Sequence, residues 1–185
     1  MAKTKLSKAK FVTRGYGQVE VNHLSAVRTG QIYAQLPAKS DIEFLENGQF
    51  AKYDYEKGLV DFEGKGEWML VLNEVKVYEA RETDEDFAMI KDNYNARVYD
   101  ATGTLMPAGT TMVPRLFKTN IGDIYTTNTV NEDAGDLTVG TELVVGDDGY
   151  LTKTAGTNAG DMKWMVVKVY TLPDGKPGVK LQRIA

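Results

Sequence analysis

The run from Trp68 to Tyr78 is the feature that most constrains how this chain can fold. Its first half, Trp68 to Leu72, is apolar at every position, so a strand built from it needs cover on both faces. In the second half Val75 and Val77 alternate with polar residues, which is the period of a half-buried antiparallel strand. We therefore predict one long strand over 68–78, or two strands that meet at Asn73.

A second run with the same order of residue types begins at Trp164 and ends at Tyr170, and the chain has no other tryptophan. Each run follows a block, at 43–52 and 142–153, in which a β-prone segment, an Asn/Asp-Gly turn, an aromatic residue and a lysine come in that order. An internal repeat would explain both blocks, and the general similarity of hairpins would explain them equally well.

Short β-prone segments separated by turns continue along the rest of the chain. Eighteen Gly, five Pro and many Val, Thr and Tyr favour many short strands over long helices. In the block 42–78 we predict a four-stranded meander whose first hairpin turns at Asn47-Gly48. Further strands are predicted at 19–21, 31–36, 98–100, 112–119, 123–130, 137–140, 141–145, 150–154, 163–170 and 179–184.

The one helix that the pattern suggests lies within residues 80–95. Thr83 and Asp86 resemble a capping box there, and Phe87, Met89, Ile90 and Tyr94 would share a face. A loop is the alternative there, because Asp and Asn are poor helix formers. The expected fold is mainly β, an antiparallel sandwich or small barrels built from two meander-like blocks, with an extended N-terminal arm and at most one short helix. The expected division is an arm over 1–17 and a β-rich domain over 18–185, with possible sub-blocks at about 18–100 and 101–185.

Charge is unevenly distributed along the chain. Residues 1–28 carry six basic side chains and one acid, whereas residues 41–86 carry fourteen acids and five bases. A basic arm on an acidic body indicates that the arm contacts something acidic: nucleic acid, another subunit or another copy's body. A solvated, frayed terminus is the alternative. As contact residues of the arm we predict Lys8, Lys10, Phe11, Val12, Arg14 and Tyr16.

The sequence offers little for catalysis or metal binding. There is one histidine, His23, and no cysteine, so a site with several His or Cys ligands is excluded. No phosphate-binding glycine motif lies between a strand and a helix. Glu132-Asp133 with Asp136, and Asp147-Asp148, are weak calcium candidates because their spacing is not that of an EF-hand. Tyr53, Tyr55, Phe62 and Trp68 would form either a stacking platform or core. We expect no cofactor, no metal and no export signal.

Several segments in a fixed order resemble structural proteins of tailed bacteriophages, most of all small capsid decoration (auxiliary head) proteins. They cover most of residues 30–184 and are Gln31–Pro37, Leu45–Phe50, Asn73–Tyr78, Val113–Phe117, Gly122–Thr129 and Val167–Gln182.

The resemblance implies a β-rich, non-enzymatic virion protein, assembled in the host cytoplasm, that binds and stabilises the capsid shell. Its expected partners are the major capsid protein and further copies of itself, without direct nucleic-acid or membrane contact. A tail or neck component is the first alternative. A carbohydrate-binding or carboxylate-dependent hydrolase domain is the second, because paired acids are abundant.

Overall fold

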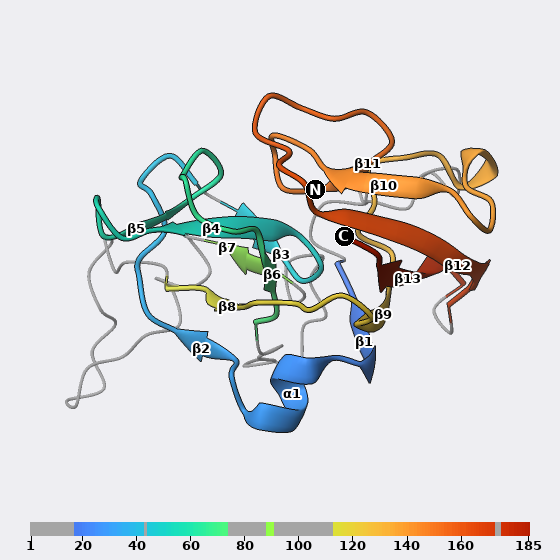
Figure 1. Ribbon diagram of the computed structural model, residues 1–185, viewed down its shortest axis with the longest axis horizontal. Coiled ribbons are helices and arrows are strands. Elements are labelled where there is room, and N and C mark those ends of the chain that lie inside the picture. The colour runs from blue at the N-terminus through green and yellow to red at the C-terminus, as the bar shows by residue number, and fades with distance from the viewer. Residues whose placement is uncertain (1–16, 43, 74–87, 91–112, 173–174) are drawn as a thin grey trace, which may run out of the picture.

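A computed structural model describes residues 17–42, 44–73, 88–90, 113–172 and 175–185. The larger of its sheets has six antiparallel strands (Figure 1). In spatial order these strands are β1 (Val19–His23), β9 (Ile124–Thr127), β13 (Pro177–Arg183), β12 (Lys163–Thr171), β10 (Glu142–Val145) and β11 (Leu151–Thr152).

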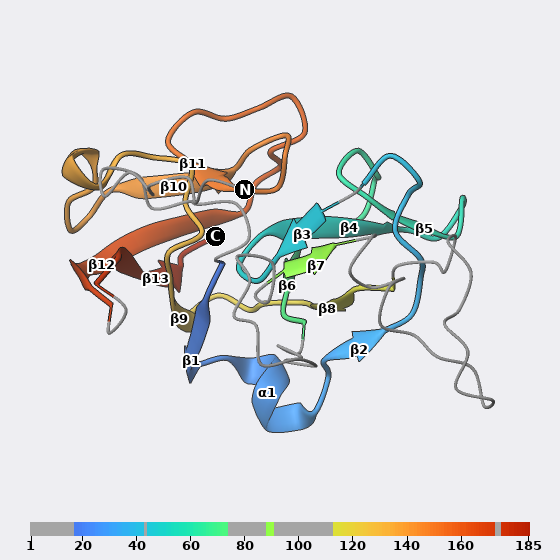
Figure 2. The ribbon, with the colours of Figure 1, turned by 180° about the vertical axis from the view of Figure 1, so that it is seen from behind.

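A second sheet has five strands, and a separate pair of strands lies beside it (Figure 2). The order of the five is β2 (Tyr33–Ala34), β8 (Arg115–Phe117), β6 (Met69–Val71), β4 (Phe50–Asp54) and β5 (Leu59–Asp61). The separate pair is β3 (Phe44–Glu46) with β7 (Ala88–Ile90). Each large sheet draws strands from both predicted sub-blocks, because β1 joins the six-stranded sheet and β8 joins the five-stranded one.

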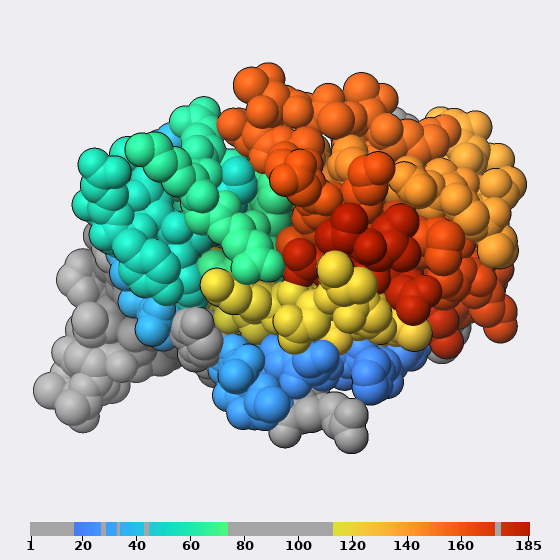
Figure 3. All heavy atoms as spheres, in the orientation of Figure 1, coloured from blue at the N-terminus to red at the C-terminus, as the bar shows by residue number. Residues whose placement is uncertain are grey.

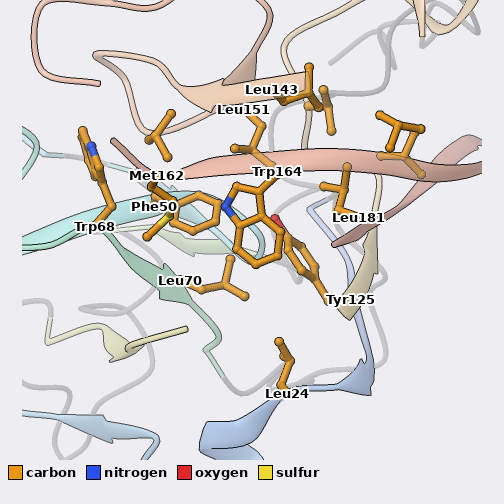
Figure 4. Close-up of a cluster of buried hydrophobic side chains, with 14 of the residues drawn as sticks. Leu24, Phe50, Trp68, Leu70, Tyr125, Leu143, Leu151, Met162, Trp164 and Leu181 are labelled. Atoms are coloured by element: carbon orange, nitrogen blue, oxygen red, sulfur yellow. The ribbon is translucent and has the colours of Figure 1, made fainter. Parts of the chain in front are cut away.

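The two large sheets share one hydrophobic core (Figure 4). Trp164 of β12 lies at its centre and is fully buried. Its ring meets Tyr125 of β9 edge-on at 4.9 Å between centroids, and Phe50 of β4 at 5.8 Å. Leu70 of β6 packs into the same cluster, so the core connects both sheets. A second, smaller core under the five-stranded sheet contains Tyr53, Val60, Met69, Val71 and Leu116.

These features confirm the mainly β prediction. Two antiparallel sheets on a common core are consistent with a sandwich, and no closed barrel occurs among the described strands. The two helical segments are short: α1 (Ser25–Thr29) and the 3-10 turn η1 (Ala134–Asp136). In the described part of the chain, no helix is both long and apolar enough to span a membrane.

The predicted meander is confirmed for the pairing of β4 with β5, and it is wrong for its other two strand pairings. The turn at Asn47-Gly48 forms, with Gly48 at φ +92° and the Gln49 amide donating to the Glu46 carbonyl at 3.2 Å. A tight hairpin of type I′ needs positive φ at both central residues, and Asn47 does not have it. The strands on either side therefore diverge: β3 pairs with β7, while β4 lies between β5 and β6.

The predicted helix within residues 80–95 is also wrong where the structure describes it. Ala88–Ile90 form β7, because pairing with β3 overrides a weak local helix preference. The α-helix lies instead at Ser25–Thr29. The buried carboxylate of Asp123 fixes its start by accepting hydrogen bonds from the Ser25 amide (3.0 Å) and hydroxyl (2.6 Å).

The two similar blocks do not fold into equivalent units. In the second block β10 pairs with both β11 and β12, whereas in the first block β6 pairs with β4, and β3 pairs elsewhere. The different pairing argues against a structural repeat. The predicted strand at 137–140 is a turn in which Gly140 has φ +91°. The predicted arm over 1–17 lies outside the described residues except for Gly17, and so do the predictions for 98–100 and for the second half of the Trp68 run.

Candidate functional site

A cavity of about 990 Å³ lies where the five-stranded sheet meets the loops of the six-stranded sheet. In the space-filling view the residues of β4, β5 and the segment that follows them (teal to green) lie beside orange residues from later in the chain (Figure 3). The lining contains an excess of four negative charges, because five carboxylates face a single lysine. Its walls are Lys39, Asp41, Ile42, Gln49, Asp61, Phe62, Glu63, Asp147, Asp148, Tyr150, Thr157 and Asn158.

Asp147 holds the glycine-rich loop 155–161 against this cavity. Its carboxylate accepts hydrogen bonds from the backbone amides of Thr157 (3.0 Å) and Asn158 (2.7 Å). A Cβ at Gly156 would overlap the same carboxylate, so a larger residue there would have to displace the Asp147 side chain. The Asp-Asp-Gly turn thus positions a loop that follows it by ten residues.

Lys52 and Trp68 hold the same loop from the other sheet. The Lys52 ammonium donates to the Asn158 carbonyl at 3.2 Å and lies 4.3 Å from the centre of the Trp68 ring. The Trp68 indole N–H lies 2.8 Å from the Ala159 carbonyl and 3.0 Å from that of Asn158. Burial lowers the pKa of the Lys52 ammonium, and the negative charge of Asp147 partly opposes that shift.

A backbone contact closes the seam between the sheets beside the cavity. The Phe50 amide on β4 donates to the Gly149 carbonyl at 2.7 Å. Next to it, the Gln49 side-chain amide donates to the Asp148 carbonyl at 2.6 Å. The cavity wall is therefore built from two parts of the chain that are about a hundred residues apart in sequence.

Asp61 is the buried acid of the cavity. One carboxylate oxygen accepts the Phe62 amide at 2.7 Å. The other is buried, lies 3.6 Å from the Lys39 ammonium, and accepts no hydrogen bond from the described residues. Lys39 also pairs with the exposed Asp41 at 3.1 Å, and this hydrogen bond, followed by the charge of Asp61, raises the lysine's pKa. Lys39 thus forms ion pairs with both Asp41 and Asp61.

The predicted site residues fall into three groups. The arm residues Lys8, Lys10, Phe11, Val12, Arg14 and Tyr16 lie outside the described residues. The aromatic platform does not form: Trp68 is buried against the 158–159 backbone, and Tyr53 and Tyr55 meet each other at 5.6 Å, so of the four only Phe62 lines the cavity. Among the described residues, no group of three or more acidic or histidine side chains is placed to hold a metal ion.

The other candidate acids support the fold. Glu132 accepts hydrogen bonds from the Thr152 hydroxyl (2.8 Å) and the Lys153 amide (2.6 Å). Burial opposes ionisation of Glu132, but these bonds and the Lys153 charge lower its pKa overall. Ser25, the serine nearest His23 in the sequence, is the first residue of α1 and donates its hydroxyl to Asp123.

The cavity as a site was not predicted from the sequence. The sequence singles out Asp147 and Asp148 only as a weak calcium candidate, and nothing local indicates that Asp61 and Glu63 share a cavity with them. The arrangement is suited to a cationic ligand, because charge excess and partial enclosure favour positive groups. Comparison of the chain with protein-family models, with curated proteins and with solved structures finds no match.

Proposed function

We propose that this chain is a non-enzymatic structural protein of a tailed-bacteriophage virion, which binds the major capsid protein at the capsid surface beside further copies of itself. The observation that carries this proposal is the division between a basic N-terminal segment and a tightly cross-connected acidic β body. The order of phage-like segments over residues 30–184 supports the same class.

The construction of the body suits a load-bearing role. The central core joins both sheets around Trp164, and the contacts of Phe50, Trp68 and Lys52 connect the sheets again at their seam. A protein that stabilises a shell needs such a stiff body, together with an extended segment that can order on a neighbouring subunit. The basic arm, with Phe11, Val12 and Tyr16 as apolar anchors, supplies that segment.

Purified virions test the proposal directly. Mass spectrometry should detect this chain in the virion, and gold-labelled antibody should mark the heads in electron micrographs. Label confined to the tail or neck would replace the capsid assignment with the tail alternative. Absence of the chain from virions would end the proposal altogether.

A binding assay then tests the arm. Added back to virions that lack it, the full-length chain should co-sediment with them in a salt-dependent manner. Replacing Lys8, Lys10 and Arg14 by Ala should reduce binding, because these bases are expected to contact an acidic capsid surface. The matched control replaces Lys57, Lys65 and Lys118, which are exposed bases of the body, and should bind as the wild type does. Equal binding of both variants would remove the arm from the proposal.

A further inference from the structure

Every charged side chain in the segment that precedes the described body is basic. Residues 1–16 contain Lys3, Lys5, Lys8, Lys10 and Arg14 and no acid. The described chain begins at Gly17, which packs so closely on the Asn47 carbonyl that a Cβ would overlap it. The next residue is held as well, since the Gln18 amide donates to Asn128 at 2.7 Å. The position where the basic segment joins the body is therefore fixed.

That junction lies close to the acidic cavity. Gly17 packs on the turn at 46–47, and Gln49, two residues further on, lines the cavity. Gln49 connects the two places, since its side-chain oxygen accepts the Glu46 amide at 3.0 Å and its nitrogen donates to Asp148. Sixteen residues reach roughly 50 Å when extended. The segment is thus long enough to turn back into the cavity of its own chain.

The cavity has the charge and the exposed groups to receive it. Asp41, Glu63, Asp147 and Asp148 are exposed, so their carboxylates are accessible to a cation. Behind them the buried oxygen of Asp61 has the shared Lys39 ammonium at 3.6 Å and no hydrogen bond from the described residues. A buried carboxylate oxygen without a hydrogen bond is costly, and a further donor would relieve that cost.

We propose that in the free protein the basic segment of residues 1–16 docks into the acidic cavity of the same chain. Single exposed ion pairs contribute little, but five bases facing an excess of four negative charges act together. The covalent link at Gly17 keeps the segment at a high effective concentration near the cavity. The inference concerns the free protein and does not rest on the capsid assignment. A capsid that takes the arm has to displace it from this cavity.

Zero-length carbodiimide crosslinking of the full-length chain tests the contact. At low protein concentration, arm lysines should link to Asp41, Glu63 or Asp148 in preference to Asp133 and Asp136, which are exposed acids that do not line the cavity. A mixture of ¹⁴N- and ¹⁵N-labelled chains identifies the partner. Crosslinked peptides of a single isotope support docking within one chain. Hybrid pairs would overturn it in favour of a second copy, and links spread evenly over all acids would overturn the cavity as the site.

Trypsin supplies a second measurement on the intact chain. Cleavage after Lys8 and Lys10 should be slower than in a synthetic peptide of residues 1–16, because docking protects these bonds. Replacing Asp41, Glu63 and Asp148 by Asn, Gln and Asn should accelerate cleavage by about fivefold or more, since proteolysis follows the population of the undocked arm. The control with Asp133→Asn and Asp136→Asn should keep the slow rate. Wild-type cleavage as fast as that of the peptide would overturn the proposal.

Discussion

The buried polar side chains of this protein are of two kinds: some form hydrogen bonds, and others form none with the described residues. Thr127 is fully buried, and its hydroxyl forms two hydrogen bonds. It donates to the Gln18 carbonyl (2.5 Å) and accepts a hydrogen bond from the Thr129 amide (2.9 Å). Both groups lie in the central core: the hydroxyl of Tyr125 forms no hydrogen bond with the described residues, and the indole N–H of Trp164 donates none to them. Burial also raises the pKa of Tyr125 well above its ordinary value.

This contrast predicts opposite effects of removing a hydroxyl. Tyr125→Phe should leave the free energy of unfolding unchanged or raise it slightly, because the lost hydroxyl pays a desolvation cost without a bond. Thr127→Val should lower it by about 1–3 kcal/mol, because two buried bonds are lost. Urea unfolding of the two variants measures this. A larger loss for Tyr125→Phe than for Thr127→Val would contradict the interpretation.

The lowered pKa of Lys52 predicts how the free energy of unfolding should change with pH. Its pKa is lowered in the folded state, so between that value and its ordinary 10.5 the unfolded chain binds more protons. Stability from this residue therefore rises with pH in that alkaline window, by about 1.4 kcal/mol for each unit of lowering. Wild type should gain stability relative to Lys52→Met as pH increases from 7 to 10.5.

The exposed Lys65→Met is the matched control and should follow the wild-type curve. Chemical unfolding at several pH values measures all three proteins. Parallel curves for wild type and Lys52→Met would show that the buried ammonium carries no such penalty.

At the scale of elements, turns decide how the sheets connect. The Asp-Asp-Gly turn after β10 was predicted, and Gly149 has the positive φ (+80°) that such a turn requires. The sequence does not indicate that this turn touches the other sheet. Gly149 is so close to β4 that a Cβ would overlap the Phe50 carbonyl and press on Phe62. Gly122 has a similar φ of +92° but open space around it.

Alanine substitutions at these two glycines therefore distinguish the cost of backbone strain from the cost of steric overlap with a neighbouring strand. Gly122→Ala should cost about 1 kcal/mol, which is the strain alone. Gly149→Ala adds an overlap with backbone that cannot move aside easily, so it should cost at least about 2 kcal/mol more. Thermal or urea unfolding provides the comparison. Equal losses of stability at both positions would mean that the β4 backbone moves away from the new methyl group without a measurable loss of stability.

At the scale of the whole molecule, one core serves both sheets. Trp68 reports on the seam beside β6, whereas Trp164 reports on the centre, and both belong to the same buried cluster. Strands from the first and last thirds of the chain join in the six-stranded sheet, since β1 pairs with β9. The fold therefore depends on contacts between distant parts of the sequence.

This arrangement predicts a single cooperative unfolding transition. The single-tryptophan variants Trp68→Phe and Trp164→Phe each leave one fluorescent reporter. Within each variant, the fluorescence transition and the far-UV circular dichroism transition in urea should coincide, although the midpoints of the two variants will differ. Separate transitions within one variant would show that the sheets unfold independently.

Local sequence patterns predict the β class, most strand positions and the glycine turns, because alternation and the need for positive φ are properties of a few neighbouring residues. The tertiary structure alone decided the strand pairing: β3 with β7 instead of β4, Ala88–Ile90 as strand instead of helix, and different pairing in the two similar blocks. Pairing depends on which distant surfaces bury each other, which no short window encodes. For the same reason only the fold brought Asp61 to the loop that Asp147 holds and thereby created the acidic cavity.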